Sequence, residues 1–149
     1  VATANVPLGS IVGALPDGRR SGEPLSEGGI SPYQGRNVSG PTATMRSVAK
    51  LNLEKLTNGS VLNMKFNPGL LKDEIKLRKF AALIRTFCET GGFLVQFNIV
   101  DADTLRDAQR DPEKHRDILV RVATYSAYFV ELPPEFQNDI IARTEFQEV

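Results

Sequence analysis

The sequence predicts an α/β fold, and three observations lead to this class. Helical and strand patterns alternate along residues 41–149. Residues 73–90 carry apolar side chains at the spacing of one helix face, namely Phe80, Leu83, Ile84, Phe87 and Cys88. Residues 93–100 are apolar at alternate positions and mixed in between, which is typical of a strand covered by protein on both faces.

The first forty residues predict an ordered, loop-rich lead-in segment. Turn signals recur in it as PDG, SG and GG, and a long loop of this kind is usually functional or disordered, of which we expect the former. The chain begins with Val1 instead of Met, so we expect a fragment, a processed chain or a piece that completes a larger fold. We therefore divide the chain into a lead-in segment, 1–40, and one structural unit, 41–149.

The first half of this unit is predicted to contain a helix over 41–50, a strand over 60–66 and the long helix over 73–90. Pro41 suits the first position of its helix, where its missing N–H would have no partner anyway. A turn at Asn58-Gly59 precedes the strand. Acidic residues begin the long helix and a Gly-Gly pair ends it, which agrees with the helix dipole and with C-cap preferences.

The second half begins with the strand over 93–100 and continues with four elements. These are a helix over 101–110, a helical turn over 113–119, a strand over 120–122 and a last helix over 134–143. Asp101 or Asp103 is the expected cap of the first of these helices, and Pro112 interrupts it. The expected order is loop, helix, strand, helix, strand, helix, strand, loop and helix.

The composition makes several classes of partner unfavourable. The 149 residues are 41% hydrophobic and 24% charged, with 18 basic and 18 acidic side chains and a formal net charge of zero. This balance disfavours nucleic acid and anionic membranes as partners, and no apolar run is long enough for a membrane span. Cys88 has no second cysteine for an internal disulfide, and no secretion signal is visible, so we expect a reducing cytoplasm.

No catalytic site stands out from residue chemistry alone. His115 is the only histidine and lies in a charged run, so no metal site is expected and the ring is predicted to be exposed or to form a cap. Cys88 lies on the apolar helix stripe and is predicted to be a buried small hydrophobe. Gln96 and Asn98 share one strand face and are either structural hydrogen-bonding groups or the lining of a polar cavity.

A series of sequence blocks resembles one family, in the same order, along nearly the whole chain. The blocks are ALPDGRRSGEPLSEGGISPYQGR, GPTATMRSVAKL, NGSVLNMKFNP, GGFLVQFNIVDADTL, AQRDPEKHRDILVRVA, YSAYFVEL and QNDIIART. The chain resembles the C-terminal part of glycyl radical enzymes, most closely the glycerol-dehydratase-like branch, which includes enzymes once labelled pyruvate formate-lyase-like. The resemblance implies the C-terminal portion of a ten-stranded α/β barrel with a glycyl radical loop near its end.

The resemblance also implies a radical mechanism in anaerobic metabolism. In this family a radical S-adenosylmethionine activase removes one hydrogen atom from a backbone glycine, and the radical passes to a cysteine on a second loop, which then takes hydrogen from the substrate. The stored radical is protein-derived, so no bound cofactor is implied. The implied partners are the activase, the remainder of the barrel and a second copy of the parent enzyme in a homodimer. The family's thiyl cysteine lies far upstream of this segment, and Cys88 is not in its context.

The radical loop of the family reads RVxGY followed by Ser or Ala, and Thr124 stands where the glycine is expected. The other positions, implied to shape the loop and to be recognised by the activase, are Arg121, Val122, Ala123, Tyr125 and Ser126. An α-carbon radical needs a planar centre, which a β-branched residue crowds. If the loop required a positive φ at this position, threonine would be strained by about 1–3 kcal/mol. We therefore predict that this chain cannot be activated.

Three hypotheses remain open on the sequence. The chain is the radical domain of a lyase or dehydratase, as a fragment or with a natural or engineered change at Thr124, and Asn63, Gln96 and Asn98 are then expected to line the barrel. Alternatively it is a stand-alone, non-catalytic partner of a larger glycyl radical enzyme, or a small-molecule binding module. An upstream reading frame that encodes a barrel would support the first hypothesis, and a start codon directly before Val1 would support the second.

Overall fold

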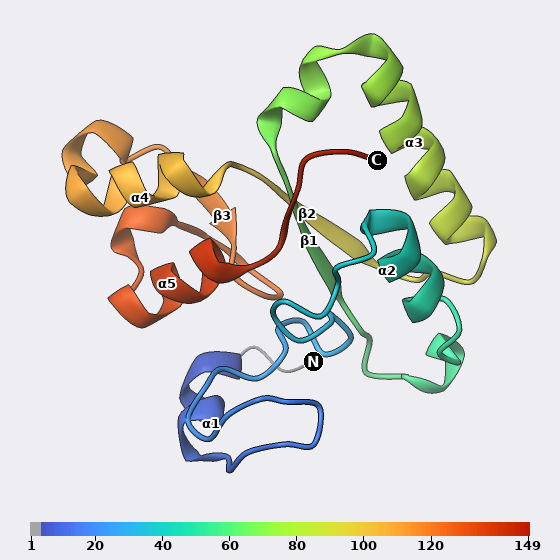
Figure 1. Ribbon diagram of the computed structural model, residues 1–149, viewed down its shortest axis with the longest axis horizontal. Helices are drawn as coiled ribbons and strands as arrows, with labels where there is room; N and C mark the ends of the chain where they lie inside the picture. The colour runs from blue at the N-terminus through green and yellow to red at the C-terminus, as the bar shows by residue number, and fades with distance from the viewer. Residues whose placement is uncertain (1–3) are drawn as a thin grey trace.

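The computed structural model describes residues 4–149 and confirms the α/β class. Figure 1 shows the elements in chain order. They are α1 (Asn5–Ile11), α2 (Pro41–Val48), β1 (Leu62–Phe66), α3 (Glu74–Glu89), β2 (Val95–Ile99), α4 (Ala102–Arg110), β3 (Leu119–Arg121), β4 (Ser126–Tyr128), α5 (Pro134–Ala142) and β5 (Glu145–Phe146). Short 3-10 helices cover Leu53–Lys55, Pro68–Lys72, Pro112–His115 and Phe129–Glu131.

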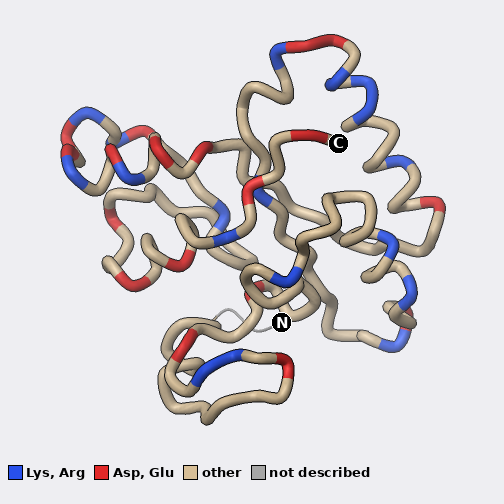
Figure 2. The backbone as a smooth tube through the Cα atoms, in the orientation of Figure 1, with Lys and Arg blue, Asp and Glu red and all other residues tan. Residues whose placement is uncertain are grey.

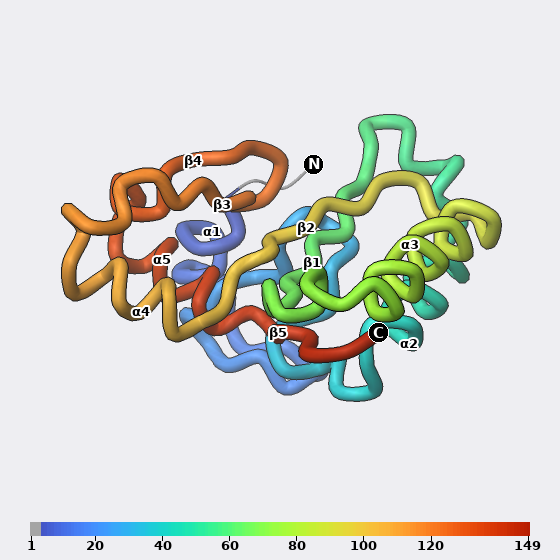
Figure 3. The backbone as a smooth tube through the Cα atoms, turned by 90° about the horizontal axis from the view of Figure 1, so that it is seen from above, coloured from blue at the N-terminus to red at the C-terminus, as the bar shows by residue number. Residues whose placement is uncertain are grey.

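Three strands form a parallel sheet in the order β2-β1-β5. The register places Leu62 opposite Val95 and Phe66 opposite Ile99. The apolar side chains at alternate positions of β1 and β2 therefore lie on the same face of the sheet. A separate antiparallel hairpin joins β3 to β4, with Arg121 opposite Ser126. Figures 1 and 3 show α2 and α3 on one side of β1 and β2, and α4, α5 and the hairpin on the other.

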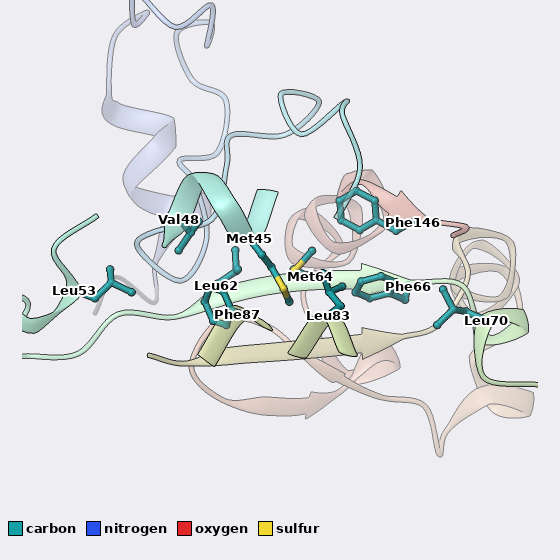
Figure 4. Packing of buried hydrophobic residues seen from close by; sticks show 10 residues of the cluster. All are labelled: Met45, Val48, Leu53, Leu62, Met64, Phe66, Leu70, Leu83, Phe87 and Phe146. Atoms are coloured by element: carbon teal, nitrogen blue, oxygen red, sulfur yellow. The ribbon is translucent and has the colours of Figure 1, made fainter. Parts of the chain in front are cut away.

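The apolar face of the sheet packs against α2 and α3, as Figure 4 shows. The buried residues of this cluster are Met45, Val48, Leu53, Leu62, Met64, Phe66, Leu70, Leu83, Phe87 and Phe146. The Phe66 ring lies edge-on, with its centroid 5.1 Å from that of Phe80 and 5.8 Å from that of Phe97, a favourable aromatic geometry. The long amphipathic helix and the alternating strand therefore meet as their sequence patterns predict.

A second apolar cluster joins α4, α5 and the hairpin. Its buried residues are Leu105, Ala108, Val120, Val122, Phe129 and Ile140. The outer surface of α4 carries alternating charges, visible in Figure 2 as neighbouring blue and red segments, with exposed ion pairs such as Arg106–Asp103 at 2.8 Å. Exposed pairs of this kind contribute little stability, so burial of the apolar cluster holds this half of the molecule together.

Two helices begin at an aspartate cap, of which the sequence predicted the one at α4. The Asp73 carboxylate accepts the N–H groups of Ile75 and Lys76 at the start of α3. At the start of α4 the Asp101 carboxylate accepts the Thr104 N–H at 2.7 Å. Of the two candidate caps for α4, Asp101 is therefore the one used, and Asp103 lies in the first turn.

Several sequence-based expectations are wrong in detail. The lead-in segment contains α1, which its turn signals did not predict, and the residues after β3 form a second strand, β4, instead of a loop. The helical turn expected over 113–119 is a 3-10 helix, Pro112–His115. Cys88 is exposed and not buried, because α3 buries only the narrow stripe that contains Leu83 and Phe87. The His115 ring is half-buried, with Nε2 2.8 Å from the Asp107 carboxylate.

The lead-in segment is ordered around one buried arginine. The Arg19 side chain is 2% exposed, and its guanidinium donates to the carbonyls of Gly9 at 2.6 Å and Gly13 at 2.7 Å. It also donates to the carbonyls of Glu23 and Pro24. A guanidinium has five donors and no acceptor, so it ties the end of α1 to the turn that follows. The segment continues along the sheet, where Gly29 bridges to Val61.

Gly28 is expected to tolerate alanine less well than its neighbour Gly29. Both have a positive φ, which costs a non-glycine residue about 1–2 kcal/mol. A Cβ on Gly28 would also lie 2.5 Å from the Val61 carbonyl oxygen, whereas a Cβ on Gly29 meets nothing within 4 Å. Gly28→Ala should therefore lower the free energy of unfolding by about 1–3 kcal/mol more than Gly29→Ala. Urea denaturation of both variants measures the difference, and equal losses would contradict the close approach.

Candidate functional site

The turn between β3 and β4 gathers the residues of the sequence motif around Thr124. The Val122 N–H donates to the Tyr125 carbonyl at 2.9 Å and closes the turn. Val122 and Ala123 are buried, Thr124 is half-buried, and Tyr125 and Ser126 are exposed. We call residues 122–125 the hairpin loop. Its first half is inside the protein and its second half faces outward.

The Thr124 backbone does not have a positive φ. Among the described residues, every position with a positive φ is a glycine, so Thr124 does not lie in the left-handed region. The condition under which the sequence predicted strain at this residue is therefore not met. We therefore attribute any effect of the β-branched side chain on radical chemistry to crowding at the α-carbon and not to a left-handed φ.

Two side chains of β2 hold the hairpin against the polar face of the sheet. The Asn98 Oδ1 accepts the Arg121 N–H at 2.8 Å, and the Asn98 Nδ2 donates to the Arg121 carbonyl at 2.9 Å. The Gln96 Oε1 accepts from the Arg121 Nε at 2.9 Å. Of the two alternatives left open by the sequence, both amides act as structural hydrogen-bonding groups, and Asn98 lines a cavity as well.

The Arg121 side chain reaches back over its own hairpin. Its guanidinium donates to the Ser126 Oγ at 3.0 Å and to the Thr124 carbonyl at 3.3 Å. One arginine therefore links β2, the start of β4 and the peptide that follows Thr124.

A buried ion pair from the end of α5 contacts the same backbone from the other side. The Arg143 Nη2 lies 2.8 Å from the Asp139 Oδ2, and both side chains are at most 5% exposed. The Arg143 guanidinium also donates to the carbonyls of Arg121, at 3.1 Å, and Val122. Neither residue was singled out from the sequence, although opposite charges four residues apart that flank the apolar Ile140 and Ile141 are a signal for a buried pair.

A small polar cavity lies beside this ion pair on the polar face of the sheet. Its volume is about 20 Å³, and its polar lining includes Glu27, Asn63, Lys65, Asn98 and Arg143. The Asn63 side chain is buried, and neither of its amide atoms has a hydrogen-bond partner among the described residues. A polar cavity of this volume has room for one water molecule. Of the three residues proposed to line the barrel, the structure therefore places Asn63 and Asn98 at this cavity, whereas Gln96 contacts the hairpin.

Burial shifts the pKa of two ionisable side chains at this cavity. Burial raises the pKa of Glu27 above its usual value, with the nearby Arg143 guanidinium opposing the shift. Burial lowers the pKa of Lys65 to about 8, with the Glu145 carboxylate opposing the shift. The Lys65 ammonium donates to the Ile141 carbonyl at 2.9 Å, near the C-terminal end of α5, where a cation is favourable.

Replacing Lys65 by methionine is expected to change how stability depends on pH. The folded pKa of Lys65, about 8, lies below its ordinary value of 10.5, so between these values the unfolded chain binds the extra proton. Raising the pH through this window therefore stabilises the native chain relative to Lys65→Met, by about 1–3 kcal/mol in total. Denaturant titrations of both proteins between pH 7.5 and 10.5 measure this difference. Parallel curves for the two would contradict a buried, shifted lysine.

Metal and membrane sites are not apparent in the described part of the chain. Residues 4–149 contain no group of three or more His, Cys, Asp or Glu side chains placed to hold a metal ion. No helix in the same range is both long and apolar enough to cross a bilayer. Cys88, the free thiol, lies on α3 across the sheet from the hairpin (Figures 1 and 3).

Comparison with known proteins finds a family model and several relatives that match this chain. A family model described as "Glycine radical" matches residues 26–130, a range that includes the hairpin loop. A probable dehydratase of Escherichia coli K12 is 48% identical over 144 residues, which are 96% of this chain and 18% of the relative. An isethionate sulfite-lyase of Desulfovibrio desulfuricans is 46% identical, over 96% of this chain and 17% of that protein.

Solved structures share the fold at high similarity. The glycerol-bound B12-independent glycerol dehydratase of Clostridium butyricum is 50% identical with a TM-score of 0.91, over 96% of this chain and 18% of that one. A glycyl radical enzyme of Archaeoglobus fulgidus is 45% identical with a TM-score of 0.89, over 97% of this chain and 18% of that one. The chain therefore spans less than a fifth of the length of these proteins, and the α/β architecture described above corresponds to a portion of their larger folds.

Proposed function

The chain belongs to the glycyl radical family, as the glycyl radical domain of dehydratase- and lyase-type enzymes, and we propose that its hairpin loop is the radical loop. Thr124 then occupies the place of the radical glycine, and the chain as written cannot store the radical. The observation that carries this proposal is the run Arg121-Val122-Ala123-Thr124-Tyr125-Ser126, which follows the family motif at each of its fixed positions except the glycine.

The geometry of the loop supports a storage role. The hairpin loop is held from two directions, by the amides of β2 and by the arginine of α5, and its first residues are buried. A radical on a backbone α-carbon is stabilised by conjugation with both flanking peptide groups, which requires a planar centre. A hydrogen on that carbon allows planarity, whereas the branched threonine side chain crowds it. In this chain burial covers Val122 and Ala123, while Thr124 is half-buried, so we propose that the remainder of the parent barrel shields the radical position from solvent and oxidants.

The rest of the proposed mechanism lies outside this chain. Cys88 is exposed on α3, across the sheet from the hairpin, so we propose that the thiyl cysteine and most of the substrate pocket belong to the remainder of the parent barrel. The parent would be a homodimer in the cytoplasm. A radical S-adenosylmethionine enzyme would recognise it through Arg121, Val122, Ala123, Tyr125 and Ser126, but could install no radical while Thr124 occupies the glycine position. The names of the relatives give different substrates. We therefore propose only a reaction class, dehydration or another lyase-type bond cleavage, and no single substrate.

A non-catalytic docking subunit is the second candidate, favoured by exposed apolar side chains. Ile11, Ile75, Phe93 and Leu119 are each more than 60% exposed, and such side chains commonly mark a surface that another protein covers. A docking subunit would co-elute with a full-length glycyl radical enzyme in size-exclusion chromatography. A chain that elutes separately at micromolar concentration would exclude this candidate.

The direct test of the proposal is electron paramagnetic resonance after anaerobic incubation with a family activase. The chain as written is expected to show no doublet from a backbone glycyl radical, while a relative that carries glycine in this motif shows one under the same conditions. A doublet from the Thr124 chain would overturn the proposal, because the radical would then lie on another residue or would be stored at residue 124 despite its side chain.

A further inference from the structure

The ion pair between Asp139 and Arg143 is the strongest feature of the molecule that the family motif does not explain. We propose that Arg143, held in place by Asp139, is a positioning residue for the radical loop, and that Gln34 connects this arrangement to the lead-in segment. The inference rests on the proposed function, since it assigns these residues a role in the conformation of the loop that contains residue 124.

The contacts of Arg143 converge on the peptide groups that lead into the loop. Its guanidinium donates to the carbonyls of Arg121 and Val122, the two residues at which β3 passes into the turn. The Arg121 carbonyl also accepts from the Asn98 amide, and the Arg121 side chain donates to the Thr124 carbonyl. Arg143 therefore restrains the backbone before the loop, and through Arg121 this restraint extends to the peptide that follows residue 124.

Asp139 orients the guanidinium and is itself fixed by a distant segment. Its Oδ2 accepts from the Arg143 Nη2 at 2.8 Å and from the Nε at 3.3 Å. Its Oδ1 accepts from the Gln34 Nε2 at 2.6 Å. Charge-assisted hydrogen bonds between buried planar groups are strong and directional, so the carboxylate has little freedom to turn and the guanidinium keeps one orientation.

The burial of this pair indicates a positional role. The side chains of Arg143 and Asp139 are 5% and 2% exposed, so both charges have lost their water. Replacing a buried ion pair by apolar residues is often neutral or stabilising, so an ion pair is not the simplest means of filling this space. An apolar pair could not bond the carbonyls of Arg121 and Val122, which would then be left without these donors. Alignment of the loop backbone is what the charged pair adds.

The first test measures the loop in the chain as written, without a radical. Hydrogen exchange with mass spectrometry should show amides of residues 122–126 exchanging at least about tenfold faster in Arg143→Lys, which keeps the charge but loses the planar fork. Gln34→Ala, a milder change, should accelerate the same segment by a smaller factor. Amides of α3 serve as the internal reference, and Arg78→Lys, in the exposed Glu74–Arg78 pair of the same spacing, is the matched control.

The exchange pattern separates positioning from general stability. Acceleration confined to residues 122–126 supports the inference, and a uniform acceleration across α3 and the hairpin, or none in either variant, overturns it. If Arg143→Lys fails to fold, Gln34→Ala is the test: faster exchange confined to residues 122–126 supports the inference, and uniform or unchanged exchange overturns it.

A second test uses the radical itself in a Thr124→Gly background. After activation, the added Arg143→Lys change should shorten the lifetime of the doublet severalfold, whereas Arg78→Lys should leave it unchanged. Equal lifetimes in the two double variants would overturn the positioning role. Absence of any doublet from Thr124→Gly alone would refute the proposed function instead, and the hydrogen-exchange result would still decide whether Arg143 positions the loop.

Discussion

Thr124→Gly is expected to produce a backbone radical doublet after anaerobic incubation with a family activase, where the chain as written produces none. Glycine has no Cβ, so the α-carbon can become planar between its two peptide groups without a clash. The measurement is electron paramagnetic resonance, with spin counting against the protein concentration. Because the surrounding motif is present, this single substitution is the largest change in chemistry that we expect from the molecule.

Thr124→Val is the matched control for this prediction. Valine keeps the branched shape of threonine and removes only the hydroxyl group. If Thr124→Val shows no doublet and Thr124→Gly shows one, crowding at the α-carbon is what prevents radical formation. If Thr124→Val also shows a doublet, the hydroxyl group of threonine is what prevents radical formation. If none of the three chains shows a doublet, residue 124 is not the radical position.

The stability of Thr124→Gly provides a further check on the same residue. Thr124 does not have a positive φ, so glycine relieves no strain there and adds freedom to the unfolded chain. We expect a loss of about 0.5–1 kcal/mol in the free energy of unfolding. A gain would mean that the native loop is strained at threonine, as the sequence led us to consider.

Asp139→Ala is expected to be the most destabilising single change, by about 3–5 kcal/mol. The substitution leaves the Arg143 charge buried without its carboxylate and removes the side-chain acceptor of Gln34. Guanidinium denaturation followed by circular dichroism measures the loss, and a chain that does not fold at all would be the extreme form of the same result.

The exposed pair on α3 is the control for the buried pair. Glu74 and Arg78 have the same four-residue spacing, but their side chains are 77% and 78% exposed. Glu74→Ala should therefore cost less than about 1 kcal/mol. Similar losses for the Glu74 and Asp139 variants would contradict the distinction between a solvated and a buried pair.

Most of the regular elements were predictable because their signals are local. The stripe on α3 and the alternation on β2 follow from periods of 3.6 and 2 residues, and both elements lie within a few residues of their predicted bounds. The cap at Asp101 was one of two candidates at the start of its helix, whereas Asp73 was expected inside the first turn of α3 and is instead its cap. Strand β4 was missed because Ser126–Tyr128 is short and polar at its start, and its identity depends on pairing with β3.

The site was predictable only as a stretch of sequence. The motif around Thr124 is contiguous, so its position was legible, but the residues that hold it are not neighbours in the chain. Asn98 and Arg143 reach the carbonyl of Arg121 from positions 23 residues before it and 22 after it. Nothing in the local pattern of α5 indicates which backbone its arginine contacts, although the spacing to Asp139 indicates a pair.

By itself the sequence determined the α/β class, the apolar faces that meet in the core and the family to which the chain belongs. These follow from residue periodicity and from contiguous motifs, neither of which depends on the path of the chain in space. Only the tertiary structure decided that Thr124 lacks a positive φ, that Cys88 is exposed, and that the Asp139–Arg143 pair lies against the loop. Backbone dihedrals, burial and long-range hydrogen bonds depend on which distant segments of the chain pack together. Local sequence patterns do not show that packing, because it depends on the whole fold.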